Sequence, residues 1–369
     1  MTDPSRRLLV FGCHEAWVAL LAGLGRPLDI VTGLKGRVGG WDARARVLPP
    51  ETRFISIADV ETGHDTYECA ILHSLSDLRD LGGVDVPRLV VFHATLEGRL
   101  VEEGSALTPA DLRALARRYL HLKRAEAVAV SALKARSWGL EEDPIPPGID
   151  VAAMPAHRGD VAAGVRVANR VASRRRILAW DFHERAFHGL PIRLIGDNPG
   201  WRTAGPARSW DHLCDALASH RFYVHTADPE LEDGYNLAML EAMACGLPIV
   251  GNPHPTSPIE HGVSGFLHED PATLGTLAAR LLADPGLAAR LGAAARRTVE
   301  RRFTPAAFHS GLAVAIDRAR RRWNAGALAR SGVAGSATGG VLASRTTGDG
   351  RFPKSGGIPR NGESPVQRA

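Results

Sequence analysis

Residues 232–246 read Glu232-Asp233-Gly234-Tyr235-Asn236-Leu237-Ala238-Met239-Leu240-Glu241-Ala242-Met243-Ala244-Cys245-Gly246. Two acids and a glycine are followed by strong helix formers, and Gly246 comes two residues before Pro248, which is the usual pattern of a helix end. Almost every residue from 235 to 245 is apolar, so we expect a helix that is buried on most sides. Glu241 is the exception, and a buried carboxylate is costly unless something hydrogen-bonds it.

This helix allows two interpretations. In the first, Asp233 is an N-cap and Glu241 is a core acid that is bonded to a neighbouring backbone amide. In the second, the helix is a ligand site. Its N-terminus then binds phosphate, because its backbone N–H groups and its dipole favour anions, and Glu241 binds hydroxyl groups.

A resemblance favours the second interpretation. The segment resembles the acid-x7-Glu signature of family 4 glycosyltransferases, in which the second acid corresponds to Glu241 and is followed here by Ala-Met-Ala-Cys-Gly-Leu-Pro-Ile-Val. Asp233 takes the place of the first acid, where the family usually has Glu, and Asn236 stands where a glycine is common. The resemblance implies the GT-B fold, an α/β architecture of two Rossmann-like parallel-sheet domains that face each other across a cleft.

The rest of the chain fits such an organisation. Residues 6–135 alternate short apolar runs with helical or polar stretches, which is typical of an α/β domain with a parallel sheet. The Pro/Gly-rich segment 144–150 is the best domain boundary. We therefore expect an acceptor-side domain over 1–150, a nucleotide-sugar domain over 151–305, and a helix over 306–323 that crosses back to the first domain. Residues 324–369 are rich in Gly, Ser, Thr, Pro and Arg, which predicts a disordered tail.

Candidate ligand-binding residues of the first domain follow predicted strands. Gly12 lies between the first strand and the first helix, where α/β domains place ligands, and the Gly-, Arg- and Pro-rich segment 33–50 is predicted to be a mobile loop or lid. His73 and His93 each end a strand, so both are expected at one edge of the sheet. Phe92-His93-Ala94-Thr95 resembles the Phe-His-Thr segment of lipid-directed family 4 enzymes. That resemblance gives His93 the role of facing the donor sugar, with His73 as a second candidate.

The second domain supplies candidate diphosphate ligands. Asn169-Arg170-Val171 and the cluster Arg174–Arg176 occupy the place of the Gly-Arg-Leu…Lys-Gly segment of the family, whose Arg and Lys hold the donor diphosphate. A guanidinium can bond two phosphate oxygens at once. The resemblance therefore implies a donor site with Arg170 and Arg174, together with the backbone of Gly234, Tyr235, Asn236 and Leu237.

The resemblance implies transfer of a sugar from a nucleoside diphosphate sugar with retention. Glu241 would hold the ribose, Asp233 a sugar hydroxyl and His93 the sugar from the opposite domain. Donors that meet the charge of the departing diphosphate are the largest available catalytic contribution. The sequence has no Asp-x-Asp placed for a diphosphate-bound cation and no His/Cys cluster, so we expect neither a metal nor a cofactor besides the donor.

Composition limits the compartment and the partners. The 369 residues are 44% hydrophobic, and no apolar run approaches the ~20 residues that span a bilayer. The four scattered cysteines and a start that resembles no signal peptide predict a cytoplasmic protein. Four of the five net positive charges lie in 323–369, so we expect no nucleic-acid partner. The acceptor (a glycan, a lipid or a small molecule) stays open, as does peripheral membrane contact.

Two other functions stay open at this point. One is another enzyme of the same fold, such as a nucleotide-sugar epimerase, which would consume the donor without any acceptor. The other is a catalytically degenerate protein that binds a nucleotide sugar or serves as a scaffold. Asp233 in the place of the usual Glu keeps the second alternative open.

Overall fold

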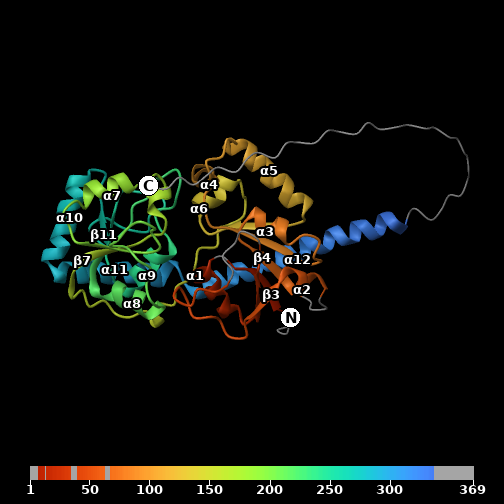
Figure 1. Cartoon of the computed structure of the whole chain (residues 1–369), viewed down its shortest axis with the longest axis horizontal. Coiled ribbons are helices and arrows are strands. Elements are labelled where there is room, and N and C mark those ends of the chain that lie inside the picture. The colour runs from red at the N-terminus through yellow and green to blue at the C-terminus, as the bar shows by residue number, and fades with distance from the viewer. Residues whose placement is uncertain (1–6, 13, 35–39, 63–66, 336–369) are drawn as a thin grey trace, which may run out of the picture. The chain divides into compact units, whose positions relative to one another are not determined.

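The computed structural model describes residues 7–335 except 13, 35–39 and 63–66. The described residues up to Ala327 form one compact unit that contains two parallel sheets (Figure 1). The first sheet has the strand order β3-β2-β1-β4-β5-β6. Its strands are β1 (Arg7–Phe11), β2 (Leu28–Thr32), β3 (Arg53–Ser56), β4 (Tyr67–Leu72), β5 (Arg88–Phe92) and β6 (Glu126–Ala129). This is the doubly wound order of a dinucleotide-binding domain, which binds ligands at the carboxyl ends of its strands.

Both faces of the first sheet are buried, as the continuous apolar strands predict. Leu9 and Phe11 of β1 belong to one core, and Leu8 and Val10 belong to the other. The first core is covered by α3 (Leu75–Asp80), α4 (Leu96–Glu103), α5 (Pro109–Leu122) and α6 (Ala132–Trp138). The second is covered by α1 (Glu15–Val18), the 3-10 helix η1 (Ala19–Leu24) and α12 (Pro305–Gly335); the short α2 (Ile57–Thr62) follows β3.

The second sheet has the order β11-β10-β9-β7-β8 and is also parallel. Its strands are β7 (Val161–Val167), β8 (Ile192–Ile195), β9 (His220–Val224), β10 (Ile249–Gly251) and β11 (Gly265–Leu267). The helical elements around it are η2 (Val151–Ala153), η3 (Val171–Arg174), α7 (Trp180–Ala186), α8 (Trp210–Ser219), α9 (Leu237–Cys245), α10 (Pro271–Ala283) and α11 (Pro285–Arg302). Two parallel-sheet α/β domains are what the sequence predicted.

Helix α9 is the helix predicted from residues 232–246, and all its residues from Met239 to Cys245 are buried. It ends as predicted at Gly246, whose φ of 88° lies in the left-handed region that glycine adopts without strain. It packs closely on α11, because a Cβ on Gly292 would lie only 1.8 Å from the carbonyl oxygen of Gly246. The backbones of the two helices therefore meet at a pair of glycines.

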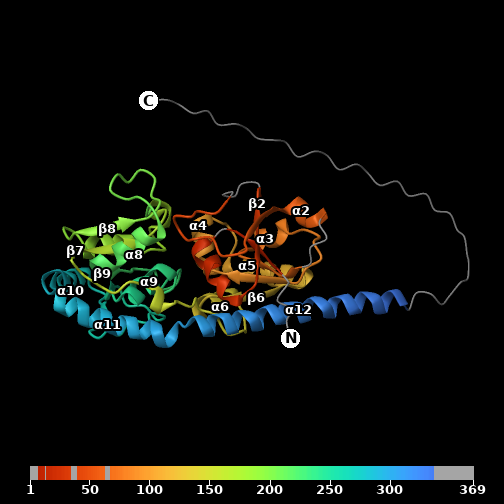
Figure 2. The same ribbon diagram turned by 90° about the horizontal axis from the view of Figure 1, so that it is seen from below.

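Two chain segments connect the domains side by side. The backbone N–H of Ile149 donates to the carbonyl of Phe303 at 2.8 Å, and a Cβ on Gly148 would lie 2.6 Å from the Cα of Pro305. From Pro305, α12 runs along the first sheet (Figure 2), and its residues Phe308, Leu312, Ala315, Ile316 and Ala319 enter the first-domain core. The helix continues past Trp323, where the predicted tail begins, and residues 336–369 of that tail lie outside the described residues.

Two further findings concern the membrane and the thiols. In the part of the chain that the structure describes, no helix combines the length and the apolar character needed to cross a membrane. The described cysteines Cys69, Cys214 and Cys245 are buried free thiols.

Candidate active site

A cavity of about 500 Å³ lies where the carboxyl ends of strands from both sheets meet. The first domain lines it with residues that follow β1, β2, β5 and β6, namely His14, Trp17, Arg46, His93 and Lys134. The second domain lines it with residues that follow or belong to β7, β9 and α9, among them Arg166, Arg174, Glu232, Asp233 and Glu241. The cavity thus gathers charged groups that lie far apart in the sequence.

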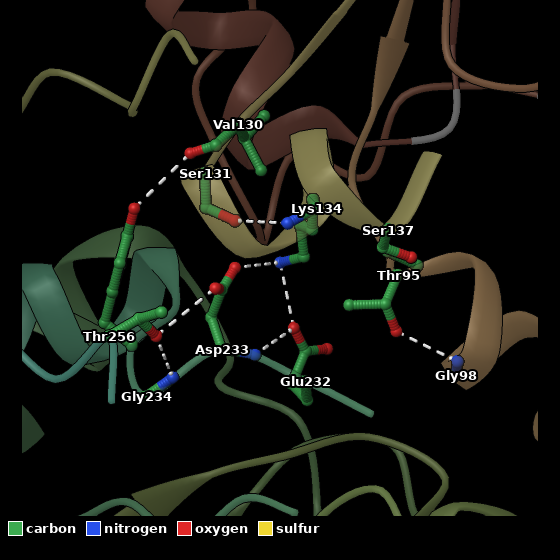
Figure 3. Close-up of polar contacts among 12 residues, drawn as sticks. Thr95, Gly98, Val130, Ser131, Lys134, Ser137, Glu232, Asp233, Gly234 and Thr256 are labelled. Atoms are coloured by element: carbon green, nitrogen blue, oxygen red, sulfur yellow. Dashed lines mark hydrogen bonds and ion pairs between the residues drawn. The ribbon is translucent and has the colours of Figure 1, made fainter. Parts of the chain in front are cut away.

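Lys134 connects the two domains at the entrance to α9 (Figure 3). Its Nζ lies 2.8 Å from Glu232 Oε1 and 2.9 Å from Asp233 Oδ2; the Lys134 and Asp233 side chains are buried, and that of Glu232 is 14% exposed. Burial lowers the pKa of Lys134, but the two carboxylates outweigh burial and leave its pKa raised. Burial likewise raises the pKa of Glu232, yet Lys134 reverses the effect and the pKa is lowered. The lysine is therefore charged and the Glu232 carboxyl is ionised at neutral pH.

Asp233 is held on both sides of its carboxylate. Its Oδ1 accepts from Thr256 Oγ1 at 3.3 Å, and that same hydroxyl accepts from the N–H of Gly234 at 2.9 Å. A Cβ on Gly234 would lie 2.7 Å from the ring of His254, so any larger residue there would require the His254 side chain to move. Asp233 is therefore fixed in place before the helix begins.

The N-cap of α9 is Asn236, and the interpretation of Asp233 as the N-cap is therefore wrong. The Asn236 side chain accepts from the N–H of Met239 at 2.8 Å, and the helix starts at Leu237. An Asn in this place satisfies one of the first-turn donors that an α-helix otherwise leaves unpaired. Asp233 instead forms an ion pair with Lys134 and accepts a hydrogen bond from Thr256.

Glu241 lies one turn into α9 and faces Arg46 of the first domain. Arg46 Nη2 contacts Glu241 Oε1, and the guanidinium also lies over the ring of Trp210, with 3.5 Å between Cζ and the ring centre. Burial raises the pKa of Glu241 to about 7, although Arg46 opposes that shift. This carboxyl is therefore poised between its two protonation states near neutral pH.

Three histidines gather at the edge of the first sheet. Nδ1 of His73 lies 2.8 Å from Nε2 of His93, and the His14 ring centre lies 4.5 Å from that of His93. Trp17 meets His93 edge to face at 5.1 Å. Burial and the neighbouring imidazoles hold the pKa of His93 well below its usual range. His93 thus presents a neutral ring to the cavity.

Arg174 is the member of the arginine cluster that lines the cavity. Its Nη2 lies 3.6 Å from Glu232 Oε2, and its Nε lies 3.7 Å from Glu102. Arg175 pairs with Asp181 and Glu184 on the surface. Arg170 is exposed with a φ of 50°, which is unusual for a residue with a side chain.

Most of the predicted site residues therefore meet in one place. Among the described residues that line the cavity are Asp233, Glu241, His93, Arg174, Tyr235, Asn236 and Leu237, while Gly234 and Arg170 are not. The N–H of Gly234 is directed to Thr256 and is therefore not aimed at a ligand.

Sequence reasoning missed several charged residues that line the cavity, among them Arg46, Lys134, Arg166 and Glu232. Lys134 could have been found, because it follows β6 at the same sheet edge that pointed to His73 and His93. Arg166 in β7 could also have been predicted from the sequence, since a charged residue inside an apolar strand needs a partner. In the structure Arg166 is buried and donates to Thr226 Oγ1 at 2.8 Å. Arg46 gave no such signal, because its partner Glu241 lies 195 residues further along the chain.

Across the described residues, no group of three or more His, Cys, Asp or Glu side chains is placed to hold a metal ion. The groups in the cavity that could meet an anion include the organic cations Lys134 and Arg174 and the first turn of α9.

Comparisons with known proteins agree with this arrangement. Residues 174–308 match a family described as glycosyl transferase-like. No curated protein sequence matches the chain. Among solved structures, HepE of Anabaena in complex with UDP and glucose shares 14% identity at a TM-score of 0.63 over 85% of this chain and 99% of its own.

Two other solved structures share the fold. Sucrose-phosphate synthase of Thermosynechococcus elongatus has 15% identity and a TM-score of 0.53, covering 89% of this chain and all of its own. Staphylococcus aureus TarM, in complex with fondaparinux, α-GlcNAc-glycerol and UDP, has 13% identity and a TM-score of 0.52. That match covers 67% of this chain and 55% of TarM, so this chain spans about half of TarM. The chain thus has the GT-B fold of glycosyltransferases, and its second domain carries a glycosyl transferase-like segment, as its sequence predicted.

Proposed function

We propose that this protein transfers a sugar from a nucleoside diphosphate sugar to an acceptor hydroxyl, with retention at the anomeric carbon. One observation carries the proposal: the acids Asp233 and Glu241 and the cations Lys134 and Arg174 line one cavity at the carboxyl ends of two parallel sheets. Ligands of α/β sheets bind at that edge. HepE, which shares the fold, is seen with UDP and glucose, and this supports a UDP-sugar as the first donor to test.

The proposed roles follow from charge and position. The diphosphate lies at the first turn of α9, where Leu237 lines the cavity and the helix dipole favours anions, and Arg174 meets it from the side. Glu241, further along the helix, accepts hydrogen bonds from the ribose hydroxyls. Asp233, fixed by Thr256, accepts one from a sugar hydroxyl.

Lys134 and His93 act from the first domain. As the bond to the diphosphate breaks, the sugar becomes positive and the leaving group negative, so preorganised cations lower the barrier most. Lys134 supplies such a charge from a site with little water. His93, being neutral, lies against the sugar without repelling its developing positive charge.

We propose that no metal is needed, because the positive charge that a divalent cation would supply is available from Lys134, Arg174 and the start of α9. Turnover is then expected to be unchanged by EDTA and not to depend on added Mn²⁺. A strict requirement for Mn²⁺ would contradict this part of the proposal. Retention is checked by the anomeric signal of the product in a proton NMR spectrum taken during turnover.

The experiment that tests the function starts with thermal unfolding in the presence of UDP, GDP, ADP, CMP and dTDP. A ligand at about 100 times its dissociation constant adds about 2.7 kcal/mol to the free energy of unfolding, which raises Tm by several degrees. The nucleotide that stabilises the protein then selects the donor sugars to test for turnover.

Substitutions of the two acids test whether the proposed donor site is the site of turnover. Asp233→Asn and Glu241→Gln are expected to lower kcat/KM by at least about 100-fold, since each removes a charged hydrogen-bond acceptor from the donor site. Glu230→Gln is the matched control, because Glu230 is an exposed acid of the same segment. Equal activity of all three variants would contradict the proposed site.

A non-catalytic nucleotide-sugar-binding protein is the second candidate. One observation favours it: Lys134 and Arg46 pair with Glu232, Asp233 and Glu241, so the acids of the cavity already have partners. Donor binding without turnover, for any acceptor class, would support this candidate. We also propose a reducing compartment such as the cytoplasm, which the buried free thiols support.

A further inference from the structure

Arg46 stands at the end of the cavity where Glu241 lies. Its guanidinium contacts the Glu241 carboxylate on α9 and covers the Trp210 ring at the start of α8. The Arg46 side chain is 11% exposed and that of Glu241 is 5% exposed. The first domain therefore reaches across and seals a position that is built from two helices of the second domain.

The segment that carries Arg46 is anchored on its own domain. Trp41 donates from Nε1 to the carbonyl of Arg46 at 2.7 Å, and Arg46 Nη1 donates to the carbonyl of Ala45 at 2.6 Å. Trp41 and Leu48 pack against the first-domain core on either side of it. The guanidinium is thus presented by a segment that belongs to the first domain, so separation of the domains would withdraw it.

A guanidinium can make the same two kinds of contact as a nucleoside. Its N–H groups donate to a carboxylate as ribose hydroxyls do, and its flat face stacks on an aromatic ring as a nucleobase does. We infer that Trp210 is the stacking surface for the base of the donor nucleotide, and that Arg46 occupies the nucleoside position until the nucleotide displaces it. The inference rests on the proposed function and names the residues that would bind the nucleoside.

The local structure is suited to this exchange. Ser209 caps α8 by accepting from the N–H of His212 at 3.1 Å, which fixes the helix whose first residue is Trp210. Leu213, one turn further on, lines the cavity. Glu241 would be a costly buried carboxylate if it faced an empty site. Arg46 reduces that cost in the absence of ligand, and the ribose hydroxyls take its place as hydrogen-bond donors when the nucleotide binds.

Titration calorimetry with UDP at about pH 8 and physiological salt tests the inference. Arg46→Ala is expected to bind UDP about three- to tenfold more tightly than the wild type, because the competing side chain is gone. Trp210→Leu is expected to bind about tenfold more weakly, and Trp210→Phe to keep most of the affinity. Inorganic pyrophosphate, which has neither base nor ribose, should bind all these variants as it binds the wild type.

Matched controls lie close by. Arg44→Ala removes an exposed arginine of the same segment, and Trp201→Leu removes a tryptophan of the same domain that packs on Trp180; both should bind UDP as the wild type does. Circular dichroism checks that each variant is folded, and Trp210→Phe keeps the test valid if Trp210→Leu unfolds.

The possible results separate the inference from the function beneath it. If UDP binds the wild type but binds Arg46→Ala more weakly, or ignores both changes at Trp210, the inference is overturned and the proposed function stands. If neither the wild type nor Arg46→Ala binds UDP, GDP, ADP, CMP or dTDP, the proposed function is overturned together with the inference.

Discussion

Several residues that line the cavity carry charges that are buried next to charges of the opposite sign. The free-energy cost of burying each charge is offset only because the charges are paired. Lys134 holds two carboxylates, and Arg46 holds a third. Removing one member of a buried pair leaves an uncompensated charge, which costs more than the pair itself contributes. The site is therefore sensitive to single changes in stability as well as in activity.

Lys134→Met is expected to lower the free energy of unfolding by about 3–5 kcal/mol at neutral pH, because Asp233 then lies buried without the cation it pairs with and Glu232 keeps only the more distant Arg174. The folded-state pKa of Glu232 is depressed in the wild type, so its contribution exists above the ordinary pKa of a glutamate and disappears as pH falls through the depressed value. The difference between the two proteins should therefore shrink in acid. Urea unfolding at several pH values measures it.

The control for this change is Lys123→Met, on a partly exposed lysine after α5 that lies near Tyr119. Its expected effect is within about 0.5 kcal/mol. Equal losses in the two variants would show that the interdomain pairing contributes nothing to stability.

The Arg46–Glu241 pair should reveal itself through pH. The folded-state pKa of Glu241, about 7, lies above its unfolded value, so the group's contribution to stability is complete below the unfolded pKa and declines as pH rises towards 7. Arg46→Ala raises that pKa further, because the opposing cation is lost. Below pH ~7 the carboxyl is protonated in both proteins, and they differ by about 0.5–1 kcal/mol from the lost stacking on Trp210.

Above pH ~7 the difference should widen by up to about 1.4 kcal/mol per pH unit, because only the wild type ionises Glu241 at low cost. Urea unfolding across this range gives the slope. The double variant Arg46→Ala/Glu241→Gln should show no widening, since the titrating group is gone. A gap of the same size at every pH would mean that Arg46 does not influence the ionisation of Glu241.

At the scale of elements, α9 shows what the sequence could and could not predict. Its end at Gly246 could be predicted from the sequence, because a glycine after the last turn and Pro248 beyond it are local signals of a helix end. Its start was not, because Asp233 and Asn236 are both good capping residues and the choice depends on Lys134, about 100 residues away. The two sheets followed from the apolar alternation, whereas the partners of each cavity residue did not.

The contact between α9 and α11 gives a prediction at this scale. In an open helix Gly→Ala stabilises by about 0.5–1 kcal/mol, but a Cβ on Gly292 would lie 1.8 Å from the carbonyl of Gly246. The overlap cannot be relieved without separating the helices, so Gly292→Ala should destabilise the protein by about 1–3 kcal/mol.

Urea unfolding of Gly292→Ala is best compared with that of Gly83→Ala, where the added Cβ meets nothing within 4 Å. The control should be neutral or slightly stabilising, by up to about 1 kcal/mol. If Gly292→Ala is the more stable of the two, the close approach of the two helices is wrong.

At the scale of the whole molecule, the described residues up to Ala327 form one compact unit, in which segments of one domain pack on the other. Helix α12 contacts the first domain through both ion pairs and apolar side chains. Arg318 and Arg322 each lie 3.2 Å from the buried carboxylate of Glu126, while Phe308 meets Trp17 edge to face at 5.7 Å. None of these partners could be read from the sequence, since each pair is separated by well over 150 residues.

Phe308 gives the prediction at this scale, because α12 starts directly after the second domain and Phe308 is 2% exposed in the core of the first. Phe308→Ala should lower the free energy of unfolding by about 3–5 kcal/mol. Val314→Ala, on the same helix but 52% exposed, should change it by less than about 0.5 kcal/mol. Scanning calorimetry is the right measurement, because the unit 1–327 should still unfold in a single transition at a lower temperature. Two separate transitions in Phe308→Ala, with the second domain melting as in the wild type, would show that α12 stabilises the first domain alone and does not join the two.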